Sequence, residues 1–369
     1  MLMTDQAIGE IKILTRTNTQ IRRLGYLKQI CRFVQDDPCP RLEVINRLEQ
    51  WAASNQFRLD TYVSDKGVIR RSGKSLGAKR YLEFAQDLEL VTEASGYLRL
   101  TKTGRIVTSI ESIAQVPAVG NPFQLGPEER LLFLYQMLLL DKDYLLPILK
   151  LTSQCHKQLD LQKQTRTALL EHFKIIERRA VSQIVRSEAE ERRNTLLGWT
   201  KPVRYSEHLT IPRLNWLLDL ELIDWEPFTA SREFVPSNIA RLLLRSMPTV
   251  DGDIFIDRHW CQNDLFTVWA SGSNVSTKSW EMLTNSERGV LIKDSVSIGF
   301  SLFRTMEYPR ISAYQLVLFT VIRLLFRENV VAGFENIKKA LSEYSDSSPD
   351  GWVFYWTQMD DDGYVLLPR

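Results

Sequence analysis

The stretch Ser75–Val107, SLGAKRYLEFAQDLELVTEASGYLRLTKTGRIV, decides the fold of this chain. Apolar side chains at helical spacing from Tyr81 to Leu88 predict an amphipathic helix, with Ser75 at its N-cap position. A Ser-Gly pair at 95–96 is a turn signal, and the next four residues alternate between apolar and polar like a short strand. The stretch therefore predicts a helix, a hairpin and the beginning of another helix.

A run of basic residues leads into this helix, because no acidic residue occurs from 66 to 80. Phosphate binding requires Lys or Arg beside backbone amides or a helix N-terminus, and the serines and glycines at 72–77 leave the backbone accessible. The run is the strongest functional signal in the sequence, although a solvated loop that only aids solubility is the alternative. Its cationic residues are Lys66, Arg70, Arg71, Lys74, Lys79 and Arg80.

The residues before this run complete a module of helices. Thr17–Val34 has apolar residues at three- and four-residue steps and predicts a helix that ends at Asp36–Pro40, because proline cannot continue it. The spacing at Leu42–Ala52 predicts a second helix, and Phe57–Val63 predicts a short strand. Residues 1–115 are thus expected to form an N-terminal module.

A second unit of the same kind is predicted further along the chain. The sequence DLELV at 87–91 recurs as DLELI at 219–223. A polar turn, a short strand and an apolar helix follow in both places, which favours a repeated supersecondary unit. Leucines and acids are common in helices, so a chance match is the alternative. If the repeat is real, 81–107 and 213–243 each fold as helix, hairpin, helix.

The segment between the two units is predicted to be helical. Residues 116–127 are rich in proline and glycine and predict a linker, and Pro127 begins a helix. Leu131–Leu140 is apolar on nearly every side, which predicts a buried helix. Leu159–Leu197 predicts one or two long helices. We therefore divide the chain into an N-terminal module (1–115), a helical connector (116–198), a second module (199–248) and a C-terminal α+β region (249–369).

The C-terminal region gives a partial prediction. Ile311–Phe326 and Phe334–Tyr344 predict helices, and Trp352–Leu367 predicts a hairpin that turns at Asp362-Gly363. Helix, helix and hairpin form either a third module or a capping element. Between 249 and 310 only a strand at 253–257 is predicted, and the fold of that part is left open.

Catalytic and metal-binding patterns are weak. The four histidines have neither HxxxH nor HExxH spacing, and there is no GxxxxGK[ST] or GxGxxG motif. Asp251, Asp253 and Asp257 resemble the acidic residues of a metal nuclease, but no ExK partner follows them at short distance. Asp360–Gly363 lacks the later ligands of a calcium loop. We therefore expect no enzyme activity, no cofactor and no metal.

Composition describes an ordinary globular protein. The net charge of the 369 residues is only +2, so a basic surface has to come from local clustering of charges. No apolar run approaches 18 residues, the length of a membrane-spanning helix. The four cysteines are far apart and without CxxC spacing, which predicts free thiols in a reducing, cytoplasmic compartment.

At 75–107 and 213–243 the chain resembles tandem winged helix-turn-helix DNA-binding proteins. The resemblance implies a mainly α fold with short β-hairpins as wings, arranged as tandem winged-helix modules joined by long helices. It also implies that the first helix enters the major groove and that the wing lies beside it. The residues this assigns to DNA contact are Lys79, Arg80, Glu83 and Gln86 on the helix, Lys102 and Arg105 at the wing, and Lys201, Arg204 and Arg213 in the second module.

The sequence therefore predicts a non-enzymatic protein that binds double-stranded DNA. It would act as a regulator or as the recognition subunit of a larger system, such as a mobile-element or antiviral defence complex. The alternative is a scaffold subunit whose winged helices bind other proteins, since Trp216, Leu217 and Leu218 make the second helix more apolar. A weaker alternative is the recognition part of a nuclease. The oligomeric state is left open.

Overall fold

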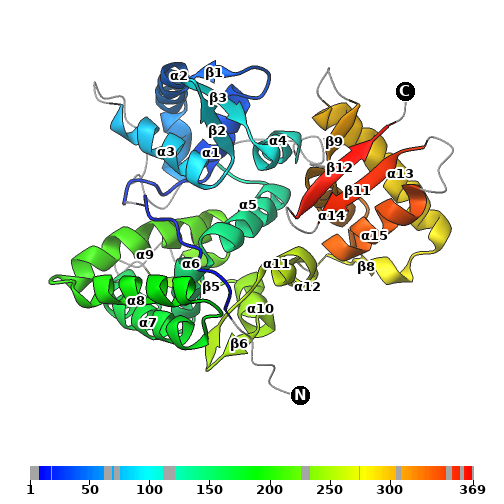
Figure 1. Cartoon of the computed structure of the whole chain (residues 1–369). Coiled ribbons are helices and arrows are strands. Elements are labelled where there is room, and N and C mark those ends of the chain that lie inside the picture. Colours follow the sequence, from blue (N-terminus) through cyan, green and yellow to red (C-terminus); the bar gives the residue numbers. More distant parts are fainter. Residues whose placement is uncertain are drawn as a thin grey trace.

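The structure is a computed structural model of the chain. It describes residues 8–17, 19–61, 69, 75–110, 121–225, 233–273, 275–304, 309–345, 351–357 and 361–367. The described part is mainly helical, with short sheets of two or three strands, as the sequence predicts. Figure 1 shows the N-terminal elements (blue to cyan), the middle ones (green) and the C-terminal ones (yellow to red) gathered around helix α5 (Pro127–Leu140).

The first module has the element order of a winged helix. The strand before α2 pairs antiparallel with the second strand of the hairpin, Cys39 opposite Leu98, so the sheet order is β1-β3-β2. This pairing holds the hairpin against the helices and projects it as a wing. The elements are α1 (Gly25–Phe33), β1 (Cys39–Pro40), α2 (Arg41–Ser54), the 3₁₀ helix η1 (Gln56–Thr61), α3 (Leu76–Asp87), β2 (Val91–Ala94), β3 (Tyr97–Leu100) and α4 (Lys102–Ser109).

The middle unit repeats this order with an additional helix. Lys157, just before α7, forms an antiparallel bridge with Glu233, which precedes the second strand of the next hairpin. Lys157 lies in the predicted connector, so the connector contributes to this unit. The elements are α6 (Lys142–Thr152), α7 (Gln158–Arg179), α8 (Gln183–Leu197), α9 (Pro202–Asp219), β4 (Ile223–Trp225), β5 (Phe234–Pro236) and α10 (Asn238–Ser246).

The C-terminal unit shows the same pairing a third time. Its elements are α13 (Asn285–Phe303), β9 (Arg310–Ser312), α14 (Ala313–Arg327), β10 (Val330–Val331), α15 (Phe334–Ser345), β11 (Val353–Thr357) and β12 (Asp362–Leu366). The sheet order is β11-β12-β9, and the strand before α14 again pairs with the last strand of the hairpin. The hairpin β6 (Thr249–Val250) and β7 (Asp253–Ile254), α11 (Arg258–Asn263), α12 (Leu265–Gly272), β8 (Lys278–Ser279) and η3 (Trp280–Met282) connect it to the middle unit.

The DLEL match marks a recurring turn. Glu89 and Glu221, the third residues of the two copies, both have a φ of +54°. Leu90 and Leu222 then donate from their backbone N–H to the carbonyl five residues earlier, at 2.9 and 2.8 Å. This hydrogen bond is the closing bond of a Schellman turn, which ends a helix and sends the chain into the hairpin. The predicted order of helix, hairpin and helix is confirmed in both places.

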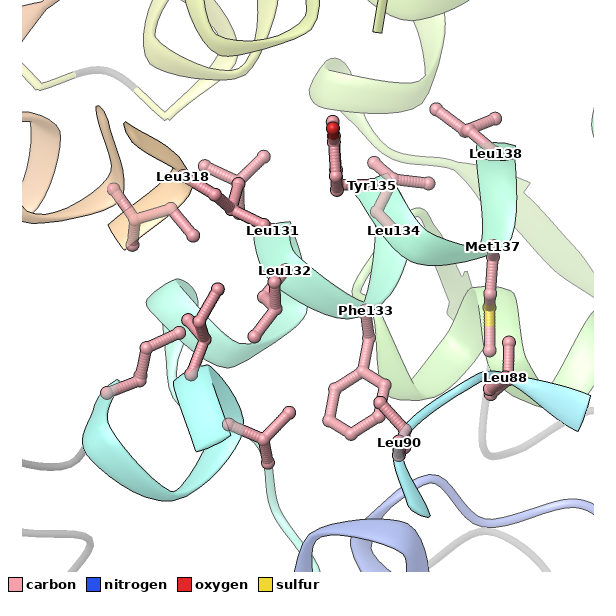
Figure 2. Packing of buried hydrophobic residues seen from close by; sticks show 14 of the residues in the cluster. Leu88, Leu90, Leu131, Leu132, Phe133, Leu134, Tyr135, Met137, Leu138 and Leu318 are labelled. Atoms are coloured by element: carbon pink, nitrogen blue, oxygen red, sulfur yellow. The ribbon is translucent and has the colours of Figure 1, made fainter. Parts of the chain in front are cut away.

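Helix α5 holds the units together, which explains why it is apolar on nearly every side from Leu131 to Leu140. Leu131 and Phe133 are both at most 1% exposed. In Figure 2 the ring of Phe133 lies beside Leu90 of the first module, while Leu131 faces Leu318 on α14. One buried hydrophobic cluster accordingly includes residues of the first module, the middle unit and the C-terminal unit.

The helix predicted at Thr17–Val34 begins later than the sequence indicates. It starts at Gly25, and the prediction of helix before that point is wrong. The backbone N–H groups of Arg22 and Arg23 donate to the hydroxyl of Tyr81, at 3.0 Å each, and that of Leu24 donates to Asp219 at 2.7 Å. Side chains from distant helices thus bind the amides just before α1.

Two other local predictions are corrected. The strand predicted at Phe57–Val63 is the 3₁₀ helix η1 as far as residue 61, and residues 62–63 lie outside the described part. The C-terminal hairpin is present, but Gly363 lies within β12 opposite Trp356 and the turn comes before Asp362. A Cβ atom at Gly363 would lie 1.9 Å from the carbonyl oxygen of Tyr355, so close strand approach requires this glycine.

Candidate nucleic-acid interface

Helix α3 buries one face and presents cations on the other. Tyr81 and Phe84 are at most 2% exposed, whereas Lys79 is exposed and Arg80 half-exposed. Arg80 donates to the side-chain oxygen of Gln20 at 2.7 Å. Ser75 precedes the helix as predicted, but it has a φ of +46° and its side chain makes no cap hydrogen bond.

The basic run before α3 is fixed to the core at one residue. Ile69 is 3% exposed, and its backbone N–H donates to the hydroxyl of Tyr26 at 3.1 Å. A Cβ atom at Gly77, in the first turn of α3, would lie 3.7 Å from the Ile69 side chain. The run therefore passes beside the beginning of α3. The other predicted contacts of this run, Lys66, Arg70, Arg71 and Lys74, lie outside the described residues.

The two polar residues predicted to face the groove interact with a residue that the sequence analysis missed. Arg41, the first residue of α2, forms an ion pair with Glu93 at 2.6 Å and approaches Glu83 at 3.8 Å. It also donates to the side-chain oxygen of Gln86 at 3.3 Å. Glu83 and Gln86 are only half-exposed. To contact a base edge, each of them would have to give up its interaction with Arg41.

The wing carries a cation that was also missed. Arg99 and Tyr97 are two residues apart on β3, so they share one face of the hairpin, and both are exposed. Leu98 between them is buried. Thr92, directly opposite Arg99, is exposed as well. The alternation of apolar and polar residues from Tyr97 to Leu100 could have predicted that Arg99 points away from the core, because Leu98 before it points inward.

Lys102 has a different position from the predicted one. It pairs with Asp362 on β12, and its backbone carbonyl accepts a hydrogen bond from Gln315 on α14 at 3.2 Å. Burial raises the pKa of Asp362. Hydrogen bonds from Lys102 and from the backbone of Tyr314 and Gly363 lower it by more, so the pKa lies below its ordinary value. This side chain connects the first module to the C-terminal unit, so the ion pair with Asp362 competes with the predicted DNA contact of Lys102.

The remaining predicted cations divide into exposed and buried ones. Arg105 on α4 is half-exposed, and Lys201 and Arg204 at the beginning of α9 are exposed. Arg213 is 0% exposed, and its guanidinium donates from Nε and Nη2 to both carboxylate oxygens of Asp141, at 2.7 and 2.6 Å. The prediction that Arg213 contacts DNA is wrong, because a fully buried guanidinium cannot reach a phosphate.

The first module covers the second half of α9. Trp216 stacks on Phe84 of α3 with ring centroids 4.7 Å apart, and its indole N–H donates to the carbonyl of Ile21 at 3.0 Å. Asp219 forms a buried ion pair with Arg23 at 3.2 Å. Burial raises the pKa of Asp219 to about 6, against the opposing effect of Arg23. This half of α9 therefore cannot enter a DNA groove in this arrangement.

The corresponding helix of the C-terminal unit presents paired charges. Lys338 on α15 is 2.8 Å from Glu335 and lies over the ring of Trp356, with its ammonium 4.4 Å from the ring centroid. Lys339 is 78% exposed and pairs with Glu343 at 3.7 Å. These four charges sum to zero. The charges of α3 also sum to zero, but its anions Asp87 and Glu83 lie within 3.6 and 3.8 Å of Arg16 and Arg41 from other segments.

The acidic residues at 251–257 interact with protein groups. Asp251 pairs with Arg179 at 2.9 Å, and Asp257 caps α11 by accepting from the backbone of Trp260 at 2.8 Å. Asp253 accepts from His172 at 2.7 Å and pairs with Lys150 at 3.0 Å. Burial raises the pKa of Asp253, but these partners lower it to about 2 overall. Nowhere in the described part do three or more His, Cys, Asp or Glu residues form a group that could hold a metal.

Comparison of the chain with protein-family models and with curated proteins finds no match. Among the described helices none has the length and hydropathy to cross a bilayer. All four cysteines are buried free thiols, as predicted. The functional interpretation therefore rests on the geometry of α3, its wing and their neighbours.

Proposed function

We propose that the protein binds duplex DNA through its first module and that it does so without catalysis. Helix α3 would face the major groove, and the β2–β3 hairpin would lie beside it. The observation that carries this proposal is the combination of the winged-helix strand order β1-β3-β2 with cations at Lys79 and Arg80 on the helix and Arg99 on the hairpin. The protein would act as a regulator or as the recognition subunit of a larger assembly.

The two kinds of residue have different roles in this proposal. Lys79, Arg80 and Arg99 would contact phosphates, which supplies affinity without sequence preference. Glu83 and Gln86 would meet base edges and supply preference between sequences. Phosphate binding releases counterions, so the logarithm of the affinity falls linearly with the logarithm of the salt concentration. Each contacted phosphate adds about 0.9 to the magnitude of this slope. The salt slope therefore measures the first role separately from the second.

The test is a fluorescence anisotropy titration of labelled duplex DNA with the full chain at several salt concentrations. Lys79→Ala combined with Arg99→Ala should lower the slope by up to about 1.8, because two phosphate contacts are lost. Lys339→Ala is the matched control, since Lys339 is an exposed helical lysine outside the proposed interface. An unchanged slope in the double variant, with native circular dichroism, would contradict the proposal.

A second function, that of a protein-interaction scaffold, is favoured by the C-terminal unit. Its helix α15 has a neutral face, and Tyr355 and Tyr364 on its wing are 51% and 36% exposed. Tyrosine is enriched at protein interfaces. If the wild-type chain shows no salt-dependent binding to duplex DNA of any sequence, the scaffold becomes the better account of the whole protein.

A further inference from the structure

Strand β11 is an outermost strand of the C-terminal sheet, and its sequence is unusual for such a position. In the sheet order β11-β12-β9 it pairs with β12 on one side, and no strand of the described residues pairs with its other edge. Its five residues, VFYWT at 353–357, carry no charge and contain neither proline nor glycine. Val353 and Tyr355 are 49% and 51% exposed. Figure 1 shows the β11–β12 hairpin (red) beside β9 and among the helices of the C-terminal unit.

The outermost strands of the hairpin sheets in the first module and the middle unit are protected. Strand β2 carries Glu93, β4 carries Asp224, and β1 has two residues of which one is Pro40. Charge, proline and short length are the ordinary means by which proteins prevent unwanted pairing at a sheet edge. The edge of β11 lacks all three, which indicates that a strand pairs with it in the functional protein.

We propose that β11 pairs antiparallel with β11 of a second copy of this chain, about a two-fold axis at Tyr355. Each Tyr355 then lies opposite its counterpart. Phe354 lies opposite Trp356 of the other copy, and Val353 lies opposite Thr357. Aromatic and β-branched cross-strand pairs are favourable, and no like charges meet, so the strand is complementary to itself. A two-fold interface uses the same patch on both subunits, as this pairing does.

The chemistry of the edge limits what can occupy it. Alternating backbone N–H and C=O groups along a strand are matched by another extended backbone. The symmetric distribution of side chains about Tyr355 favours an identical strand over an unrelated one. The two three-stranded sheets would join into one six-stranded sheet. This inference does not depend on DNA binding, because the wing beside α3 belongs to a different sheet.

A disulfide cross-link tests the pairing and its register. Directly opposite residues of an antiparallel pair have Cα atoms about 4.5–5.5 Å apart, within the range that a disulfide spans. Tyr355→Cys should therefore form a covalent dimer under mild oxidation, seen on a non-reducing gel. Val353→Cys should not, because Val353 faces Thr357 of the other copy. The native cysteines are buried, which keeps background cross-linking low. Equal cross-linking of the two variants would overturn the proposed register.

Sedimentation velocity of the full chain over a concentration series tests the dimer itself. The wild type and Tyr355→Phe should sediment as dimers. Tyr355→Lys should sediment as a monomer with native circular dichroism, because it places two ammonium groups directly opposite each other on the axis. If Tyr355→Lys fails to fold, the cysteine pair still decides the question. A wild-type chain that remains monomeric at every concentration, with no cross-link in Tyr355→Cys, would overturn the proposal.

Discussion

The first module and the middle unit have the same order of helices and hairpin, yet their interiors are built differently. The first module packs aromatic rings, and Tyr26 contacts Tyr81, Phe123 and Trp51 at centroid distances of 4.6, 5.0 and 6.0 Å. The middle unit buries pairs of opposite charge inside itself, whereas the buried Arg23 and Lys28 of the first module pair with Asp219 and Glu129 outside that module. Arg213 and Asp141 are both 0% exposed, and a second buried group joins a histidine to two aspartates.

The buried charges of the middle unit bind the N-terminal arm, residues 8–17. Asp143 accepts from the backbone N–H of Lys12 at 2.6 Å, and Asp141 accepts from that of Leu14 at 2.9 Å. Arg213 in turn donates to the carbonyl of Leu14 at 3.2 Å. The middle unit therefore uses its buried charged residues to hold distant parts of the chain, whereas its exposed cations Lys201 and Arg204 lie at the beginning of α9.

The largest effect is expected at Arg213. Arg213→Leu would leave Asp141 buried without its partner, and breaking a buried pair in this way costs about 3–5 kcal/mol of unfolding free energy. Arg204 lies nine residues earlier on the same helix and is exposed. Arg204→Leu should therefore change the unfolding free energy by less than about 0.5 kcal/mol. Urea unfolding followed by circular dichroism measures both. Equal effects of the two substitutions would contradict the distinction between the two halves of α9.

The second prediction concerns pH. His172 lies between Asp143 and Asp253, at 3.1 and 2.7 Å. Burial lowers its pKa, but the hydrogen bonds and charges of the two aspartates raise it to about 9 overall. A histidine whose folded pKa is raised stabilises the fold fully below its unfolded value near 6.5, and this contribution is lost as pH rises toward 9.

The unfolding free energy should therefore fall between pH 6.5 and 9, by at most about 1.4 kcal/mol per pH unit from this one group. Urea titrations at several pH values in this window measure the slope. His172→Gln should abolish this part of the dependence, whereas the exposed His259→Gln should retain it. A His172→Gln slope equal to that of the wild type would show that the histidine is neutral in the folded protein.

The smallest effect is expected at Lys102. Its ion pair with Asp362 is 57% exposed on the lysine side, so Lys102→Ala should reduce the unfolding free energy by no more than about 1 kcal/mol. The salt slope of DNA binding should not change, since the ammonium group is held by the C-terminal unit. The anisotropy series that tests the combined Lys79→Ala and Arg99→Ala variant measures this. A fall in the slope of about 0.9 in Lys102→Ala, the value for one phosphate contact, would restore Lys102 to the wing surface.

Local patterns were sufficient for the elements that form from neighbouring residues. The spacing at 81–88, the turn at 95–96 and the two DLEL copies predicted α3, its hairpin and the repeat in α9. Helix α5 was also predicted, because a surface that is apolar on nearly every side requires burial on nearly every side. These features depend on residues within about five positions of each other, so the sequence contains their cause.

Tertiary contacts decided the rest. The sequence does not distinguish Arg204 from Arg213, because their difference lies in Asp141, which is 72 residues from Arg213. Lys102 meets Asp362 across 260 residues, and Lys157 meets Glu233 only once the middle unit has folded. The beginning of α1 likewise depends on Tyr81 and Asp219. The sequence by itself determined which elements form, and only the tertiary structure decided which charges remain free, since that depends on partners distant in the chain.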